Sequence, residues 1–366
     1  MQTKQYPFYI QSTVVLFGLI LFIYALATLA DILIPLAFSA FIAILLNRLV
    51  NKLEKFRLPK IVAISVSLLI ATIFIAGVFY FLSSQISSFG ATIPALKMKF
   101  SHIINDLQMW TFKHFGIDTQ RQAKFIKDTV NNSKGLVGQT ITTVLGLLSV
   151  VLLIPVYVFL ILLYKTLIIN FLYEVFSEEN SVRVAEILQE TKSAIQSYIV
   201  GLLTETLIVA IMNSIALLLL DVKYAILFGV IGALLNMLPY IGGIIAIALP
   251  VLMATVTKDG YSTQLGIIAA YLVIQFIDNN ILVPRIVSSK VQINALVSII
   301  VVLLGGALWG ISGMFLSIPF IAVLKIVFDR IDDLKPWGKL FGDTVPTRSI
   351  GHIWLRRRQR LSQNQM

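Results

Sequence analysis

Two carboxylates lie within or at the end of long apolar runs of this sequence. Glu205 stands a turn or more inside the run that begins at Ile199, and Asp278 directly follows the run that ends at Ile277. A charged side chain in hydrocarbon is costly, and it usually marks an ion or proton pathway. Glu205 is therefore a candidate for coupling to a proton or a cation. The alternative is a carboxylate at a helix end in the membrane interface.

Amide side chains accompany Asp278 in the sequence. Gln275 precedes it by three residues, and Asn279 and Asn280 follow it directly. Together they supply oxygen atoms of the kind that bind Na⁺ or a polyol. We therefore take Gln275, Asp278 and Asn280 as candidate ligands for a solute or ion, with Asp278 also a candidate for coupling. A polar helix cap is the alternative interpretation of this group.

Two apolar segments are too long for one straight crossing, and each is broken near its middle. Tyr224–Val256 is interrupted from Asn236 to Gly243, and Ile293–Phe328 is interrupted by a glycine-rich stretch. Non-helical backbone persists at membrane depth only where protein buries it or where it lines a wet cavity. A pair of such breaks points to the substrate site of a transporter. The break residues that we expect to contact a polar solute are Asn236, Pro239, Tyr240, Gly242, Gly243, Trp309, Gly310 and Gly313.

The two breaks share a loose plan. Tyr240 and Trp309 each stand ten residues before a proline, Pro250 and Pro319. If each segment is a helical hairpin, the two enter the membrane from opposite faces and their tips can meet near its midplane. The alternative is that the small residues only let helices pack closely.

The composition of the chain indicates the elements that hold these residues. Of 366 residues, 58% are hydrophobic and 13% are charged, whereas globular chains carry about 25% charged residues. The net charge of +11 is then a mark of membrane sidedness, and we expect no nucleic-acid partner. The chain has no cysteine, and its three histidines lack metal-binding spacing. We expect no metal, no cofactor and no catalytic residues, and hence a protein that is not an enzyme.

About 20 apolar residues cross a bilayer as a helix, and several runs reach or approach that length. The unbroken spans that we predict are Phe8–Ala30, Ile32–Leu46, Ile61–Leu82, Ile141–Tyr164, Ile199–Leu220 and Tyr261–Ile277. With the two broken hairpins, the sequence predicts an all-α membrane protein of about eight transmembrane segments. The predicted regions are an N-terminal three-span region (1–82), an extracytoplasmic amphipathic insertion (83–140), a fourth span (141–164), a cytoplasmic amphipathic helical segment (165–198), a transport core (199–328) and a basic cytoplasmic tail (329–366).

Basic residues predict the orientation. The loop Asn47–Lys60 and the tail after Phe328 are rich in Lys and Arg, which collect on the cytoplasmic side. We therefore expect both termini to be cytoplasmic in a multi-pass protein. Segment 83–140 is also basic, which by itself favours the inside, but the span count places it outside. We further expect a homo-oligomer.

Four segments resemble the autoinducer-2 exporter family in order and spacing. They are residues 196–203, 232–243, 278–286 and 305–319, and the resemblance extends over roughly 8–335. The Asn236-x-x-Pro239-Tyr240-x-Gly242 break carries it most specifically. The resemblance implies a bacterial inner-membrane permease of about eight spans, in a family associated with export of autoinducer-2 and, for other members, with Na⁺/H⁺ exchange. This chain departs from the family pattern at Ala295, where a proline is usual, and at Glu205, where apolar residues are usual.

The sequence therefore predicts a secondary transporter that exports a small polar solute, for example a signalling molecule such as autoinducer-2. H⁺ or Na⁺ is the expected coupling ion. A monovalent cation/proton antiporter is the first alternative, and a membrane scaffold or regulatory subunit that transports nothing is the second.

Overall fold

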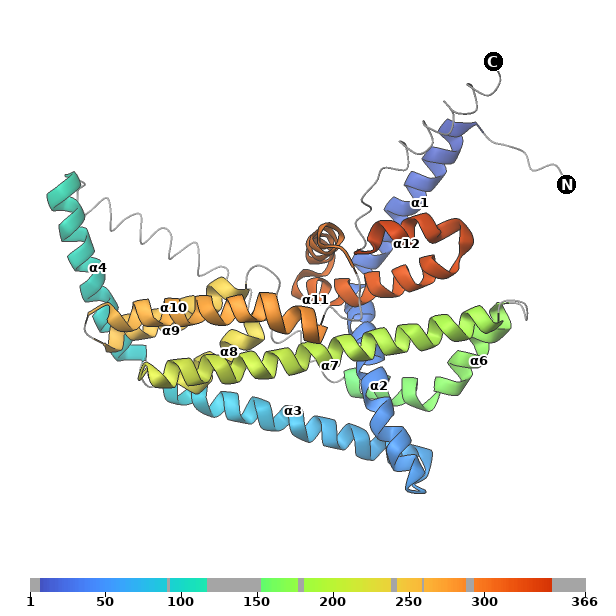
Figure 1. Ribbon diagram of the computed structural model, residues 1–366, viewed down its shortest axis with the longest axis horizontal. Helices are drawn as coiled ribbons and strands as arrows, with labels where there is room; N and C mark the ends of the chain where they lie inside the picture. The colour runs from blue at the N-terminus through green and yellow to red at the C-terminus, as the bar shows by residue number, and fades with distance from the viewer. Residues whose placement is uncertain are drawn as a thin grey trace, which may run out of the picture.

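A computed structural model describes residues 7–90, 93–116, 153–176, 181–237, 242–258, 260–287 and 293–343. Its regular elements are helices, which confirms the predicted all-α class (Figure 1). The α-helices are α1 (Phe8–Thr28), α2 (Ala30–Lys55), α3 (Lys60–Gly90), α4 (Ile93–Phe115), Leu153–Leu163, α6 (Lys165–Val175), α7 (Ser181–Leu219), α8 (Ala225–Asn236), α9 (Gly242–Thr257), α10 (Ser262–Ile277), α11 (Ala295–Arg330) and α12 (Lys335–Phe341). A π-helix, Asp278–Val287, follows α10, and a short 3₁₀ turn, Asp332–Leu334, precedes α12.

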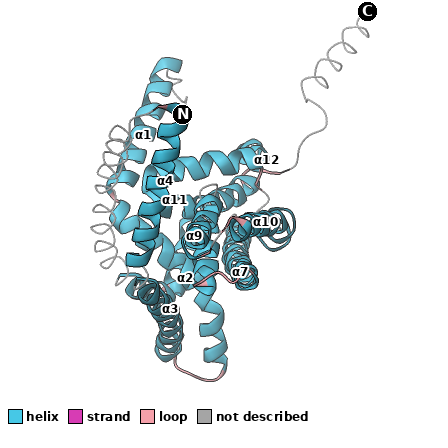
Figure 2. Ribbon diagram, turned by 90° about the vertical axis from the view of Figure 1, so that its left-hand side faces the viewer, coloured by secondary structure: helices cyan, strands magenta, loops and turns pink. Residues whose placement is uncertain are grey.

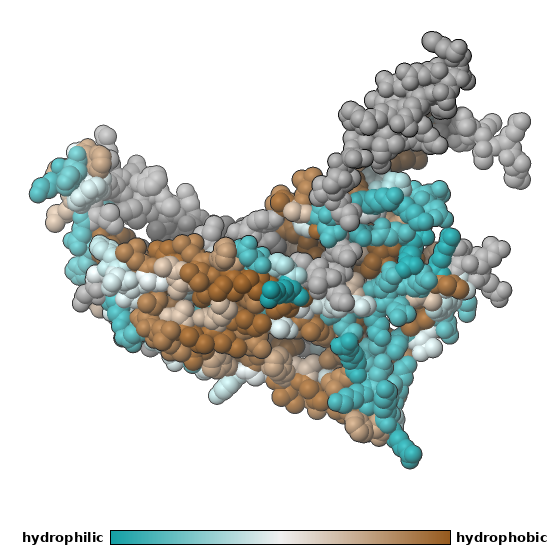
Figure 3. Space-filling model, in the orientation of Figure 1, coloured by the Kyte–Doolittle hydropathy of each residue, from teal (hydrophilic) through white to brown (hydrophobic). Residues whose placement is uncertain are grey.

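Long apolar helices account for the hydrophobic composition. Among the described residues, six helices are long and apolar enough to cross a membrane, or seven if the bent pair Leu153–Leu163 and Lys165–Val175 forms one span. This number agrees with the expected total of about eight. Apolar side chains cover the sides of α3, α7 and α10, and polar side chains gather at the ends of these helices (Figure 3). Phe74 of α3, for example, is 72% exposed, as expected for a side chain in contact with lipid.

The longest described helix, α7, packs against more of the other helices than any other element does. It runs unbroken across the position where we expected a surface segment to end and a span to begin, near residue 198. At about 1.5 Å per residue it is roughly 58 Å long, so it extends beyond the hydrocarbon core. α8 and α10 pack against it, and α7, α9 and α10 are seen end-on in Figure 2.

The first broken segment forms a helical hairpin, hairpin 1, from α8 and α9. Gly242 is required where α9 begins, because a Cβ atom there would lie 1.8 Å from the carbonyl oxygen of Leu235. The base of the hairpin is held by an ion pair between Asp221 and Lys258. Hydrogen bonding from Lys258 holds the pKa of the Asp221 carboxyl below its usual range, so this pair stays charged at neutral pH. Residues 238–241 of the tip lie outside the described residues.

The second broken segment is also a hairpin, hairpin 2, folded within α11. The backbone leaves the helical region at Trp309 and at Gly310, where φ is 58°, a value that favours glycine. The two limbs touch through their glycines, since a Cβ atom on Gly313 would lie 1.9 Å from the carbonyl oxygen of Gly305. The predicted break at the glycine-rich stretch is thus a tight turn between two packed limbs.

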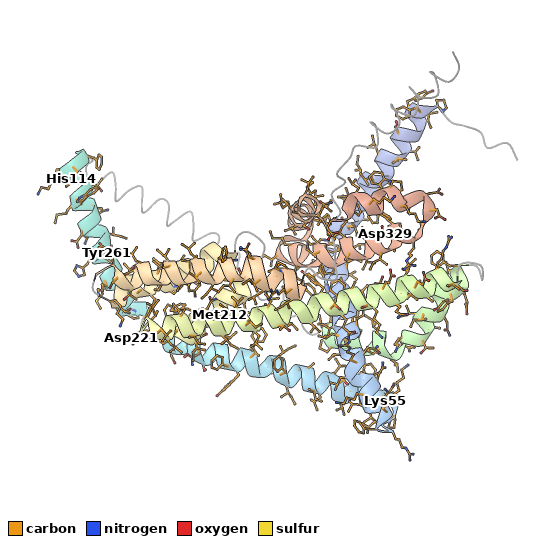
Figure 4. The ribbon with its side chains drawn as sticks, in the orientation of Figure 1. Lys55, His114, Met212, Asp221, Tyr261 and Asp329 are labelled. Atoms are coloured by element: carbon orange, nitrogen blue, oxygen red, sulfur yellow. The ribbon has the colours of Figure 1, made fainter. Side chains whose placement is uncertain are left out.

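The two hairpins have their bases at opposite ends of α7. Asp221 follows the C-terminal end of α7, whereas Arg330, at the base of hairpin 2, pairs with Glu186 and Glu190 near the N-terminal end. Asp221 and Asp329, the residue before Arg330, accordingly lie at opposite ends of the molecule (Figure 4). The hairpins therefore enter the helix bundle from opposite sides, as their sequence pattern predicted.

The described part of the tip of hairpin 1 and the second limb of hairpin 2 share one apolar cluster. Met237 of the tip and Phe315 of α11 both pack against the buried side chains of Tyr198, Leu202 and Ala322. The two hairpins are thus joined by apolar contacts near the middle of α7.

Candidate functional site

The two carboxylates singled out in the sequence meet in the structure. Glu205 projects from α7 and is 5% exposed, and Asp278 begins the π-helix after α10 and is 2% exposed. The π-helix packs against α7, so the two buried carboxyl groups lie close enough to interact electrostatically. Two negative charges this close in apolar surroundings repel each other, which favours a state in which the two groups hold one proton between them. We call Glu205 and Asp278 the carboxyl pair.

The tip of hairpin 1 supplies a third member of the site. Asn236, the last residue of α8, donates its Nδ2 hydrogen to Oδ2 of Asp278 at 2.8 Å. Oδ1 of Asp278 has no hydrogen-bond partner among the described residues. A buried carboxyl oxygen without a donor is costly, so the site is suited to receive a proton, a cation or a polar solute.

The π-helix accounts for the position of Asp278. The hydrogen-bond pattern widens there from i→i+4 to i→i+5, which shifts the register of the side chains and is frequent at functional sites. As the first residue of this widened segment, Asp278 faces both α7 and the end of α8.

Gln275 and Gly243 lie beside the carboxyl pair. A Cβ atom on Gly243 would lie 3.3 Å from Oε1 of Gln275 and 3.9 Å from Oδ1 of Asn236. The absence of a side chain at Gly243 therefore lets the amides of α8 and α10 approach each other. Gln275 also donates to Oδ1 of Asn279 at 3.3 Å, so an amide-lined surface continues from the pair along α10.

The carboxyl pair lies between the bases of the two hairpins. At about 1.5 Å per residue, Glu205 is roughly 22 Å from Glu190 and roughly 18 Å from Leu217 along α7. Both distances exceed half the thickness of a hydrocarbon core of about 30 Å, so α7 extends far enough on either side of Glu205 for the pair to lie at membrane depth.

The remaining predicted residues are placed elsewhere. Trp309 donates its indole N–H to the carbonyl oxygen of Leu26 in α1 at 3.0 Å, and Gly310 and Gly313 form the turn and limb contact of hairpin 2. Asn280 donates to the carbonyl oxygen of Phe276 at 2.8 Å in an exposed position. The structure does not bring these four residues to the carboxyl pair. Pro239 and Tyr240 lie outside the described residues.

Sequence reasoning missed a second set of buried polar side chains beside this site, Asn213 of α7 and Tyr271 and Gln264 of α10. A spacing signal was present, because Gln264, Tyr271 and Asp278 recur every seven residues and so share one face of a helix. Within the described ranges, no three His, Asp or Glu side chains come together in a group that could hold a metal ion.

Comparison with known proteins agrees with this architecture. The family model described as "AI-2E family transporter" matches residues 15–333. The AI-2 transport protein TqsA of Escherichia coli (strain K12) is 28% identical over 309 residues, which cover 82% of this chain and 86% of that protein. A putative transport protein of Haemophilus influenzae is 26% identical over 325 residues, covering 86% and 91%. The putative transport protein YrrI of Bacillus subtilis (strain 168) is 27% identical over 311 residues, covering 81% and 85%.

A family match over most of the chain, long apolar helices and a buried polar site between two opposed hairpins lead to the same conclusion. This chain is a multi-pass membrane protein, and it belongs to the AI-2E family of transporters.

Proposed function

We propose that this transporter is a secondary carrier, and that it couples the movement of a small polar solute to a proton held by the carboxyl pair. The burial of Glu205 and Asp278 next to each other carries the proposal, because two neighbouring carboxyl groups in apolar surroundings bind and release one proton at modest energetic cost. Asn236 connects the pair to hairpin 1, so a change in the charge of Asp278 is transmitted directly to the hairpin tip.

Autoinducer-2 is the first solute to test, because the E. coli relative is named as an AI-2 transport protein. Na⁺ is the second, since the oxygen atoms of Asp278, Asn236 and Gln275 are of the kind that bind hard cations. The protein would be reconstituted in liposomes, and the movement of each would be measured with and without an imposed pH gradient. A protein that moves neither under any gradient would be a scaffold and not a carrier.

We expect Glu205→Gln to uncouple transport from the proton. The amide cannot release a proton, so flux down a solute gradient should continue while an imposed pH gradient no longer drives accumulation. The measurement compares downhill flux with pH-driven accumulation in the same liposomes. Glu174→Gln, at an exposed position of α6, is the matched control and should behave like the wild type. Unchanged pH-driven accumulation in Glu205→Gln would contradict the proposal.

We further propose that the chain resides in the bacterial inner membrane as a homo-oligomer with both termini in the cytoplasm. The C-terminal part of α2 and the loop after it support this orientation, because they carry Arg48, Lys52, Lys55 and Arg57, and Lys55 lies at the end of the molecule opposite Tyr261 (Figure 4). Segment 83–140, which includes α4, would then lie outside.

Single cysteines test this orientation directly, because the chain has none of its own. Lys55→Cys should react with a membrane-impermeant thiol reagent only after the cytoplasmic side is exposed, whereas Tyr261→Cys should react from outside in intact cells. Labelling of both from the same side would exclude the opposed arrangement of the two hairpins in the membrane.

A further inference from the structure

The buried polar atoms without a hydrogen-bond partner are not scattered over the molecule. Within the described residues they are Thr191 Oγ1, Gln196 Nε2, Asn213 Oδ1, Gln264 Oε1, Tyr271 Oη and Asp278 Oδ1. Five of them belong to α7 or α10, and Asp278 begins the π-helix that directly follows α10. Folded proteins rarely leave buried polar groups unpaired, because doing so costs free energy. Their concentration in one region of the protein therefore indicates a functional role.

Asn213 and Tyr271 come together around one glycine of hairpin 1. Asn213 is 2% exposed and Tyr271 is 5% exposed. A Cβ atom on Gly232 of α8 would lie 3.4 Å from Nδ2 of Asn213 and 3.5 Å from Oη of Tyr271. The Nδ2 group makes one long hydrogen bond, 3.5 Å, to the carbonyl oxygen of Gly229. Two polar groups from different helices thus flank a position where the third helix has no side chain.

This position lies on the line between the carboxyl pair and one end of the protein. Along α7, Asn213 is roughly 12 Å from Glu205, and along α10, Tyr271 is roughly 10 Å from Asp278. Both displacements point toward the end of α7 that is followed by Asp221 (Figure 4). Gln264, with its own unpaired Oε1, is roughly 10 Å further along α10. The unpaired groups of Asn213, Tyr271 and Gln264 therefore lie on the side of the carboxyl pair that faces this end, whereas those of Thr191 and Gln196 lie on its other side.

We propose that Asn213 and Tyr271 form a second binding position on the transport route, one that takes a hydroxyl group of water or of a neutral hydroxylated solute. The amide oxygen of Asn213 accepts a hydrogen bond, and the phenol of Tyr271 both donates and accepts. A hydroxyl group satisfies both partners at once. Neither side chain is an ionised group at neutral pH, so this position favours a neutral occupant, in contrast to the carboxyl pair. The inference rests on the proposed function, for which it supplies the route.

Cysteine labelling tests whether this position is reached by water, independently of transport. In the cysteine-free chain, Asn213→Cys should react with a small hydrophilic methanethiosulfonate reagent. Val209→Cys is the matched control, because Val209 lies one turn earlier on α7, is 3% exposed and packs in an apolar cluster. It should stay unlabelled. Excess glycerol should slow the labelling of Asn213→Cys if a hydroxylated solute occupies the position, and it should have no effect if water alone does.

Substitutions that keep the shape of the site test its role in transport. Tyr271→Phe removes a hydroxyl group that has no partner among the described residues, so its melting temperature should stay equal or rise. Asn213→Leu removes an unpaired amide oxygen together with one long hydrogen bond to Gly229, so its melting temperature should change little. Solute flux should fall about tenfold in each, the effect of one lost hydrogen bond. Tyr80→Phe, at an exposed position of α3, is the control and should leave flux unchanged. A merely structural role would instead lower the melting temperature.

The two tests separate this inference from the proposed function. If the wild-type protein moves no solute but Asn213→Cys labels, carrier function fails and the hydrated position stands. If the wild-type protein transports and Asn213→Cys stays unlabelled, or if both shape-conserving variants transport normally, the second position is wrong.

Discussion

Asp278→Asn is expected to abolish proton-driven transport while leaving the folded protein as stable as the wild type or more stable. The substitution removes one of the two carboxyl groups of the proposed proton site, and the hydrogen bond from Asn236 then goes to a neutral amide instead of a carboxylate. A bond to a charged group contributes about 1.5–3 kcal/mol, so with the proton site also lost we expect flux to fall at least a hundredfold, on the order of 3 kcal/mol. The free energy of unfolding should not fall with the flux, because burying a carboxylate is itself costly and the substitution removes that cost.

The opposite directions of the two effects make this prediction specific. Flux driven by a pH gradient would be measured in liposomes, and the melting temperature would be measured in detergent. Asp333→Asn, an exposed position after α11, makes the same chemical change away from the site and should alter neither quantity. Normal pH-driven flux in Asp278→Asn would show that the pair does not couple transport to the proton.

Gly313→Ala is expected to disrupt hairpin 2. The added methyl group would lie 1.9 Å from the carbonyl oxygen of Gly305 and 2.9 Å from Cβ of Trp309. A backbone carbonyl cannot move aside as a flexible side chain can, so the two limbs must separate. Overpacking in a core commonly costs 1–3 kcal/mol. With backbone as the obstacle, we expect a destabilisation of more than about 3 kcal/mol, enough to reduce the yield of folded protein.

A second glycine provides the matched control for this experiment. Gly77 of α3 has no atom within 4 Å of the position that a Cβ would occupy, and alanine favours helix over glycine. Gly77→Ala should therefore fold with normal or improved yield and melting temperature. If Gly313→Ala matched it in size-exclusion profile and melting temperature, the close contact between the limbs would not exist in the membrane.

The breaks in the apolar segments were the most predictable part of the fold. The breaks have a local cause, since clusters of glycine, proline and polar residues within an overlong apolar run weaken a helix at that point. The sequence therefore indicated both hairpins, at Asn236–Gly243 and near Gly310, before any tertiary contact was known. The length of α7 was less predictable, because the amphipathic pattern before Ile199 and the apolar pattern after it suggest two elements where the backbone forms one.

The site itself was only partly predictable. Glu205, Asn236 and Asp278 were each singled out for their own surroundings, but their contact joins residues on α7, α8 and the π-helix. Such a contact depends on how helices pack, and local periodicity does not encode packing partners. Trp309 is the opposite case, because it lies in one of the two predicted breaks but contacts α1 and not the carboxyl pair. Asn213 and Tyr271 were not predicted, because a single polar residue in an apolar span becomes informative only when the residues that face it from other helices are known.

The continuity of α7 has a consequence for leakage. One rigid helix is bonded to hairpin 2 near its first end and packed against hairpin 1 near its second. Because α7 moves as one rigid helix, we expect a movement of its contacts with one hairpin to be coupled to its contacts with the other. A carrier that opened to both sides of the membrane at once would dissipate the proton gradient. The continuity of α7 would disfavour that doubly open state.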